Sequence, residues 1–110
     1  MGEKVTLTIE VRARPGKINE LYQTLQAFLP TMRREKGCLN CRVSRDMEDS
    51  ELYLFSSNWD TPATFEGYMR TGNGSILLGA LDLLGESTRV QVGDDAKWEG
   101  LERLQRIRRS

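Results

Sequence analysis

Histidine is absent from this chain of 110 residues, and cysteine occurs only twice, at Cys38 and Cys41. Zinc sites in proteins are built mostly from three or four cysteine and histidine ligands, so the chain has too few of these residues to form one. An imidazole that could move protons near neutral pH is also missing. General-base chemistry would therefore fall to a carboxylate or to the acidity of the substrate itself.

An excess of charge of either sign is missing too, because sixteen Lys and Arg residues balance sixteen Asp and Glu residues. A neutral chain has no global field that attracts phosphate, so we expect no nucleic-acid partner, although residues 103–109 are locally basic. The longest apolar stretch, residues 76–84, is far shorter than the roughly 20 residues that cross a bilayer. No secretion signal precedes the first alternating residues. We expect a cytoplasmic protein with no membrane partner.

Cys38 and Cys41 form a CxxC motif, which is typical of redox or metal sites. A redox CxxC usually begins a helix, whose dipole lowers the thiol pKa, whereas Arg42 and Val43 continue here as a strand. Residues three apart on a regular strand point to opposite faces, so we expect the two sulfur atoms to diverge. The pattern favours two free, buried or half-buried thiols over a redox pair.

Alternation of apolar and polar residues predicts four strands, and apolar residues at helical spacing predict three helices between them. The strands are expected at residues 5–13, 39–46, 51–59 and 88–92. The first helix is expected at residues 18–32, with a kink or loosened turn at Pro30. A second helix is expected after the cap signal Thr61-Pro62, and a third at residues 76–84 with Gly85 as its C-terminal cap.

This order predicts an α+β protein with the ferredoxin-like split β-α-β fold, a four-stranded antiparallel sheet, and a second helix that is broken in two. We place one domain at residues 4–93 and a C-terminal helical tail at 94–110. The tail either lies on a partner subunit through Trp98 and Leu101 or frays, because an isolated helix of this length is marginal.

The third strand is apolar on both faces, which the other strands are not. Leu52 and Leu54 face one side, and the other side carries Tyr53, Phe55 and Trp59. In a chain of this length the helices can cover one face only, so the other face most economically meets a second subunit. The sequence therefore predicts a homodimer.

Three segments and the element order together make residues 4–93 resemble the antibiotic biosynthesis monooxygenase superfamily. The segments are Gly37-Cys38-Leu39 with Asp46 at the end of the second strand, Asn58-Trp59-Asp60 at the exit of the third, and the helix pair that follows. The resemblance implies a homodimer of the dimeric α/β-barrel type, with a hydrophobic pocket between sheet and helices. It also implies that enzymes of this kind use no metal or flavin. A small aromatic or quinol substrate reduces dioxygen itself and is hydroxylated in a dry cavity.

Six residues are candidates for the substrate pocket: Trp59, Phe55 and Tyr53 on the sheet wall, and Phe65, Tyr68 and Met69 on the helical wall. Trp59 is open to two interpretations, as a large core residue or as a substrate contact. Tyr68 stands where enzymes of the family often carry a histidine, and its phenol can donate a hydrogen bond but is a poor base at neutral pH. Without that histidine, haem oxygenation is not expected.

The catalytic group stays unknown at this level. Asp60 and Glu66 are expected to be solvated charges near a helix start, and Asn58 alternates to the strand face opposite Trp59. Two hypotheses follow. One is a monooxygenase without metal or other cofactor that hydroxylates a small aromatic or quinol with dioxygen. The alternative is a non-catalytic dimeric ligand-binding or structural protein of the same fold.

Overall fold

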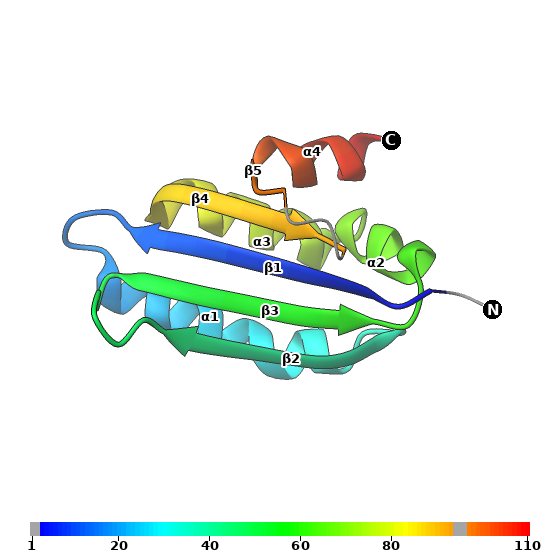
Figure 1. Cartoon of the computed structure of the whole chain (residues 1–110), viewed down its shortest axis with the longest axis horizontal. Helices are drawn as coiled ribbons and strands as arrows, with labels where there is room; N and C mark the ends of the chain where they lie inside the picture. The colour runs from blue at the N-terminus through cyan, green and yellow to red at the C-terminus, as the bar shows by residue number, and fades with distance from the viewer. Residues whose placement is uncertain (1–2, 94–96) are drawn as a thin grey trace.

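The computed structural model describes residues 3–93 and 97–110, which form an antiparallel sheet with helices packed on it (Figure 1). In chain order the elements are β1 (Val5–Ala13), α1 (Ile18–Arg33), β2 (Cys38–Arg45), β3 (Leu52–Trp59), α2 (Pro62–Met69), α3 (Gly72–Leu84), β4 (Gly85–Val92), β5 (Glu99–Gly100) and α4 (Glu102–Arg109). The strand order is β2-β3-β1-β4-β5. The ferredoxin-like α+β fold is thus confirmed, and β5 adds a fifth, two-residue strand to the predicted four.

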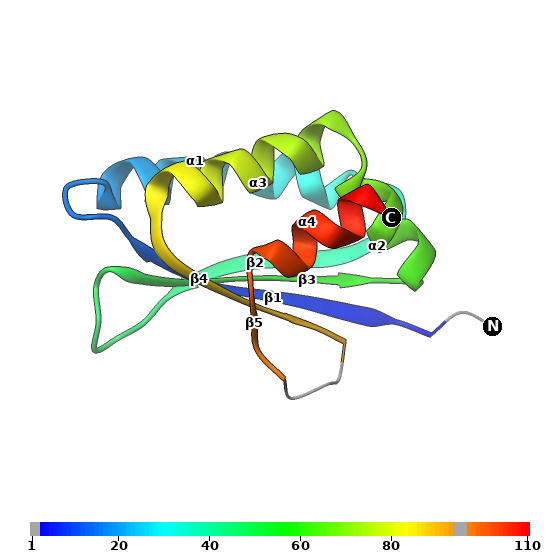
Figure 2. The ribbon, with the colours of Figure 1, turned by 90° about the horizontal axis from the view of Figure 1, so that it is seen from above.

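The two faces of the sheet differ in what covers them. Figure 2 shows α1, α2 and α3 on one side of the sheet only. Along β1 every second residue from Val5 to Ala13 is buried under these helices, and Tyr53, Phe55 and Trp59 of β3 face the same way. Leu54 lies on the open face with 37% of its surface exposed. The two apolar faces predicted for β3 are therefore real, and the described residues cover only one of them.

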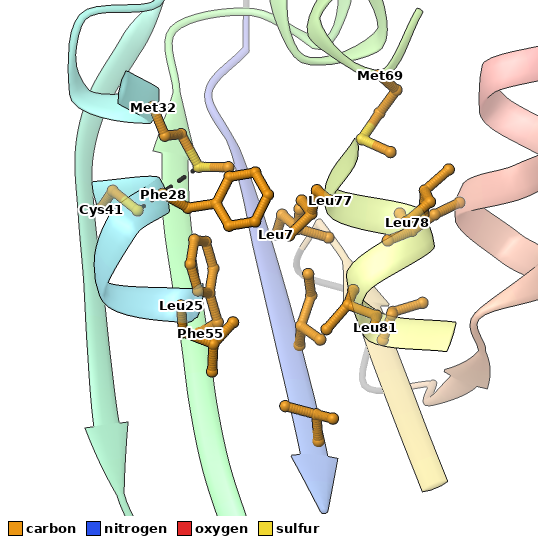
Figure 3. Close-up of a cluster of buried hydrophobic side chains, with 14 of the residues drawn as sticks. Leu7, Leu25, Phe28, Met32, Cys41, Phe55, Met69, Leu77, Leu78 and Leu81 are labelled. Atoms are coloured by element: carbon orange, nitrogen blue, oxygen red, sulfur yellow. Dashed lines mark hydrogen bonds between the residues drawn. The ribbon is translucent and has the colours of Figure 1, made fainter. Parts of the chain in front are cut away.

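The core lies between the sheet and the pair of helices α1 and α3. Figure 3 shows side chains of both helices converging on those of β1 and β3. The fully buried members drawn there include Leu7, Leu25, Met32, Phe55, Met69, Leu77 and Leu81. Burying a side chain of this size contributes about 1.5–3 kcal/mol, so this layer accounts for much of the stability of the fold.

The first helix continues through Pro30 and ends at Arg33. Proline has no backbone N–H, so the helix lacks the hydrogen bond that residue 30 would otherwise donate to the carbonyl oxygen of Gln26. The second helix begins as predicted, because the side chain of Thr61 accepts a hydrogen bond from the backbone N–H of Thr64 at 3.2 Å and Pro62 follows it.

The third helix begins four residues earlier than the sequence predicts. The side chain of Thr71 accepts a hydrogen bond from the backbone N–H of Gly74 at 3.1 Å, so residues 72–74 form the first turn of α3, and the predicted break of the second helix lies at residues 70–71. Gly85 ends this helix in an extended conformation and starts β4 directly. None of the helices in the described part of the chain is long and apolar enough to cross a membrane. A cytoplasmic location stays a prediction.

Strand β2 contains a bulge that overturns the prediction that Cys38 and Cys41 point to opposite faces, although both are free thiols as expected. Cys38 pairs with Trp59, but the next aligned residue is Asn40, opposite Asn58, so Leu39 is an extra residue. The shift of one residue brings Cys38 and Cys41 to the same, helix-covered face, whereas a regular strand would point them apart. Leu39, expected in the alternating apolar set, is 50% exposed for the same reason.

The C-terminal helix α4 packs against its own chain. Leu104 is fully buried, and the guanidinium of Arg108 donates hydrogen bonds to the carbonyl oxygens of Met69 (2.7 Å) and Thr71 (2.8 Å). Trp98 lies 4.7 Å from the guanidinium carbon of Arg89 on β4. The predicted boundary between residues 93 and 94 adjoins residues 94–96, which lie outside the described residues.

Candidate functional site

Three aromatic rings meet where β3 ends and α2 begins. The ring of Trp59 lies with its centroid 6.2 Å from that of Phe65 and 5.3 Å from that of Tyr68. The indole N–H of Trp59 donates to the hydroxyl oxygen of Ser57 at 2.9 Å, which satisfies its one polar atom. Because Phe65 and Tyr68 lie three residues apart on α2, both rings face the sheet.

The hydroxyl of Tyr68 is buried without a partner. Tyr68 is 3% exposed, and its Oη is the only buried side-chain polar atom without a hydrogen bond in residues 3–93 and 97–110. A buried polar group left unpaired costs about 1–3 kcal/mol, and most native proteins avoid this cost. Burial, with the nearby charge of Glu35 as the next cause, raises the pKa of Tyr68. The phenol therefore stays protonated and can donate a hydrogen bond.

Tyr68 is also one of the residues that line a cavity of about 340 Å³, between α2 and the turn that connects α1 to β2. Its lining consists of Glu35, Lys36, Ala63, Thr64, Gly67, Tyr68 and Thr71. On the side of α2 the wall residues are small, so the helix leaves room for a ligand. The volume is at the lower end of the range for small-molecule sites, which is about 300–1,000 Å³.

The turn beside this cavity is held against the start of α2. The backbone N–H of Asp60 donates to the carbonyl oxygen of Gly37 at 2.8 Å. Gly37 has φ +88°, and an added Cβ would come within 2.5 Å of Thr64 Cβ and 2.7 Å of Asp60 Oδ1. Only glycine meets both requirements, the left-handed backbone and the close approach.

Glu35 supplies the negative charge of the cavity. Its carboxylate is half-buried just after the end of α1 and accepts a hydrogen bond from the Asn73 side chain at 3.4 Å, near the upper limit for such a bond. An acidic group at a helix C-terminus is unfavourable, because the helix dipole places negative charge there. The charge of Glu35 reaches Tyr68, whose pKa it helps to raise.

The predicted pocket residues do not all lie together. The structure groups Trp59, Phe65 and Tyr68, as described above. Phe55 lies deeper in the core below α1, and Met69 lies toward α3 (Figure 3). Tyr53 stands six residues before the end of β3, about 20 Å away along the strand, with its ring 6.2 Å from that of Tyr22.

Two thiols from β2 and a thioether from α1 lie between the sheet and the helices. The Cys41 thiol donates to Met32 Sδ at 3.5 Å, and burial raises the pKa of Cys41 to about 12. Burial also raises the pKa of the half-buried Cys38 thiol. Both cysteines are free. Because a nucleophilic cysteine needs a depressed pKa, neither thiol has the environment of a reactive one.

The carboxylates that the sequence singled out do not line the cavity. Asp60 is exposed and accepts a hydrogen bond from the hydroxyl of Thr64 at 2.6 Å, which ties it to the start of α2. Glu66 is half-buried on α2. Within the described ranges, no three His, Cys, Asp or Glu side chains gather closely enough to hold a metal ion.

Sequence reasoning missed Glu35, Lys36 and Thr71. None of the three is among the six pocket candidates that the sequence analysis names. One signal was available: an acidic residue directly after a helix end opposes the helix dipole and so suggests a role other than stability.

Residues 4–73 match the family model of the antibiotic biosynthesis monooxygenases. The chain belongs to this family. It is similar in structure to PA3566 from Pseudomonas aeruginosa, with 25% identity, 84% of this chain and 93% of the other covered, and a TM-score of 0.76. It is also similar to SO0527 from Shewanella oneidensis (17% identity, 90% and 93% covered, TM-score 0.76). A structure described as an antibiotic biosynthesis monooxygenase has 16% identity, 84% and 99% covered, and a TM-score of 0.73.

Among curated proteins, no relative matches the sequence. Family membership rests on the sequence of residues 4–73, and the three-ring cluster rests on the geometry of β3 and α2. Helix α4 lies outside the matched residues, although it contacts the end of α2 through Arg108.

Proposed function

We propose that the protein is a monooxygenase that needs no bound cofactor and hydroxylates a small aromatic or quinol substrate with dioxygen. The observation that carries the proposal is Tyr68, which lines a cavity of about 340 Å³, packs its ring against that of Trp59 and leaves its buried hydroxyl without a hydrogen bond within the described residues. Membership of the antibiotic biosynthesis monooxygenase family supports it.

The reaction is balanced without an external reductant. A hydroquinone and dioxygen give a hydroxyquinone and water, so one oxygen atom enters the ring and the substrate supplies the electrons that reduce the other. The chain would contribute a site that orients the substrate and excludes water. Tyr68 would donate a hydrogen bond to the oxygen on which negative charge develops, an interaction worth more inside a protein than in water.

Oxygen uptake tests this proposal. The purified protein is incubated under air with a panel of one- and two-ring hydroquinones, and the rate is compared with that of the same solution without protein. We expect the protein to increase the rate of oxygen uptake with some of them. In a Tyr68→Phe variant this increase should be at least tenfold smaller. Tyr22→Phe is the matched control, because it removes the same hydroxyl from an exposed ring at the far end of α1. If oxygen uptake does not exceed autoxidation with any hydroquinone of the panel, the proposal is refuted.

A second candidate function is a non-catalytic ligand-binding protein of the same fold. It is favoured by the packing of Trp59 and Phe65, which are buried against each other, and by the raised pKa of Tyr68, which removes this phenol as a base at neutral pH. Specific binding of a hydroquinone with no acceleration of oxygen uptake would favour this candidate.

We also propose that two copies of the chain pair through the open face of the sheet. Leu52 and Leu54 supply apolar surface there, and the ion pair between Glu10 and Arg89 (2.7 Å) crosses from β1 to β4 on the same face. Sedimentation equilibrium at micromolar concentration should give twice the chain mass. A Leu54→Glu variant should shift the protein toward monomer with unchanged circular dichroism, and a monomeric wild type would refute the pairing.

A further inference from the structure

We infer that helix α4 fixes one wall of the cavity lined by Tyr68, with Arg108 as a positioning residue that binds the backbone where α2 ends. Arg108 does not line the cavity and acts through the backbone of residues 68–71. The effect on turnover rests on the proposed function, whereas the effect on the position of Tyr68 does not.

The junction between α2 and α3 carries two residues of the cavity lining, Tyr68 and Thr71. The hydroxyl of Thr71 donates to the carbonyl oxygen of Tyr68 at 2.6 Å, and the backbone N–H of Thr71 donates to the same oxygen at 3.0 Å. The Thr71 hydroxyl also accepts from the backbone N–H of Gly74 at the start of α3. A displacement of this junction would therefore move both lining residues together.

The guanidinium of Arg108 binds this junction from the side of α4. Its Nη1 donates to the carbonyl oxygen of Met69 at 2.7 Å and to that of Thr71 at 2.8 Å. A helix leaves its last carbonyl oxygens without partners of its own, and the helix dipole places negative charge there. The half-buried Arg108 thus holds the end of α2 through two short, charge-assisted hydrogen bonds.

Helix α4 can serve as a support because it is itself docked on the chain. Leu104 is fully buried, and Figure 2 shows α4 on the helix-covered side of the sheet with its C-terminal end beside α2. A second connection runs in the opposite direction: the guanidinium of Arg70 donates to the carbonyl oxygen of Ser110 at 3.1 Å and to its hydroxyl oxygen at 3.3 Å. Two arginines, one from each side, therefore join α4 to the junction.

Helix α2 needs this support because it has only 8 residues, and an isolated helix of that length is marginal. Its beginning is held by the hydrogen bond from the backbone N–H of Asp60 to the carbonyl oxygen of Gly37, and its end by Arg108. The lining runs along α2 from Ala63 near its start to Tyr68 in its last turn. The shape of the cavity therefore depends on both attachments.

Fluorescence quenching of Trp59 tests the inference without turnover. The Trp59 ring is fully buried and lies 5.3 Å from that of Tyr68, so a displaced Tyr68 would expose the indole. A Trp98→Phe background leaves Trp59 as the only tryptophan and keeps an aromatic ring beside Arg89. In this background, Arg108→Ala should raise the Stern–Volmer constant for acrylamide at least twofold, with unchanged circular dichroism.

Three variants in the same background separate positioning from general stability. Arg108→Lys keeps a cationic donor at the junction and should bring quenching back toward the parent value. Arg109→Ala, an exposed change on the same helix, should leave quenching unchanged. Arg70→Ala removes the second connection from an exposed position and should raise quenching less than Arg108→Ala does.

Unchanged quenching in folded Arg108→Ala would overturn the inference, as would an equal rise in Arg109→Ala. If Arg108→Ala does not fold, Arg70→Ala decides, and unchanged quenching there would overturn the inference. A variant that only lowered the free energy of unfolding would leave quenching of the native state as it was.

Oxygen uptake separates this inference from the proposed function. With an accepted hydroquinone, Arg108→Ala should lower kcat at least fivefold with a smaller change in KM, because Tyr68 would donate to charge that develops only during the reaction. Raised quenching without any oxygen uptake by the wild type supports the inference and removes the monooxygenase proposal. Oxygen uptake by the wild type with unchanged quenching in Arg108→Ala supports the monooxygenase and overturns the inference.

Discussion

Tyr68 packs its ring 5.3 Å from that of Trp59, yet leaves its own hydroxyl without a hydrogen bond in the described structure. The ring contact stabilises the fold, and the unpaired buried hydroxyl destabilises it. Because the ring and the hydroxyl of Tyr68 have opposite effects on stability, removing the hydroxyl alone tests whether the site serves packing or binding.

Replacing Tyr68 by Phe should stabilise the ligand-free protein by about 1–2 kcal/mol, because the ring remains and an unpaired buried hydroxyl is removed. Urea unfolding followed by circular dichroism measures the change. Combined with the loss of accelerated oxygen uptake, higher stability would show that the hydroxyl is kept for a ligand. A loss of more than 1 kcal/mol would mean that the hydroxyl has a partner after all.

Gly37→Ala should lower the free energy of unfolding by about 2–4 kcal/mol, because the new Cβ is strained at φ +88° and collides with Thr64 and Asp60. Gly16 is the matched control: its φ is +78°, but an added Cβ meets nothing within 4 Å. Gly16→Ala should therefore cost only the backbone part, about 1 kcal/mol. Equal losses in the two variants would show that the turn is not pressed against α2.

Leu104→Ala should destabilise the protein by about 2–5 kcal/mol, as expected for a fully buried leucine. Arg109→Ala, an exposed change on the same helix, should stay within about 0.5 kcal/mol. Chemical unfolding of both variants measures the difference. A small loss at Leu104 would indicate that α4 does not pack on its own chain in solution.

Burial of Cys41 predicts a loss of stability at alkaline pH. Its pKa is raised from 9.0 to about 12, so the folded state holds the thiol proton that the unfolded state releases. The stability from this group is complete below pH 9 and declines as the pH rises toward 12, by up to about 1.4 kcal/mol per pH unit. In Cys41→Ala the free energy of unfolding between pH 9.5 and 10.5 should decline less steeply. Identical slopes would rule out the buried thiol as the cause.

The sequence predicted those elements of the fold whose signals are local. Alternation along β1 and the cap at Thr61 depend on neighbouring residues, and both are confirmed. The bulge at Leu39 was not predictable, because it is defined by pairing with a strand that lies further along the chain. The same reasoning explains the error at Cys38 and Cys41: spacing alone cannot reveal a change of register.

The candidate site was predicted in part for a similar reason. Trp59, Phe65 and Tyr68 follow from one continuous segment, so pattern and family resemblance find them together. Glu35 is 33 residues before Tyr68 and reaches it only through the contact between a turn and a helix. Tyr53 and Phe55 were placed with Trp59 by strand alternation, which gives the face of a residue but not its distance from the site.

The bulge in β2 also affects how the sheet can associate with other chains. Strand β2 forms one edge of the sheet and β5 the other, and β5 has only two residues. Irregular or very short edge strands are poor templates for further strand pairing. Copies of this chain should therefore meet through the broad face that carries Leu54, and growth of the sheet from edge to edge into open-ended aggregates is disfavoured.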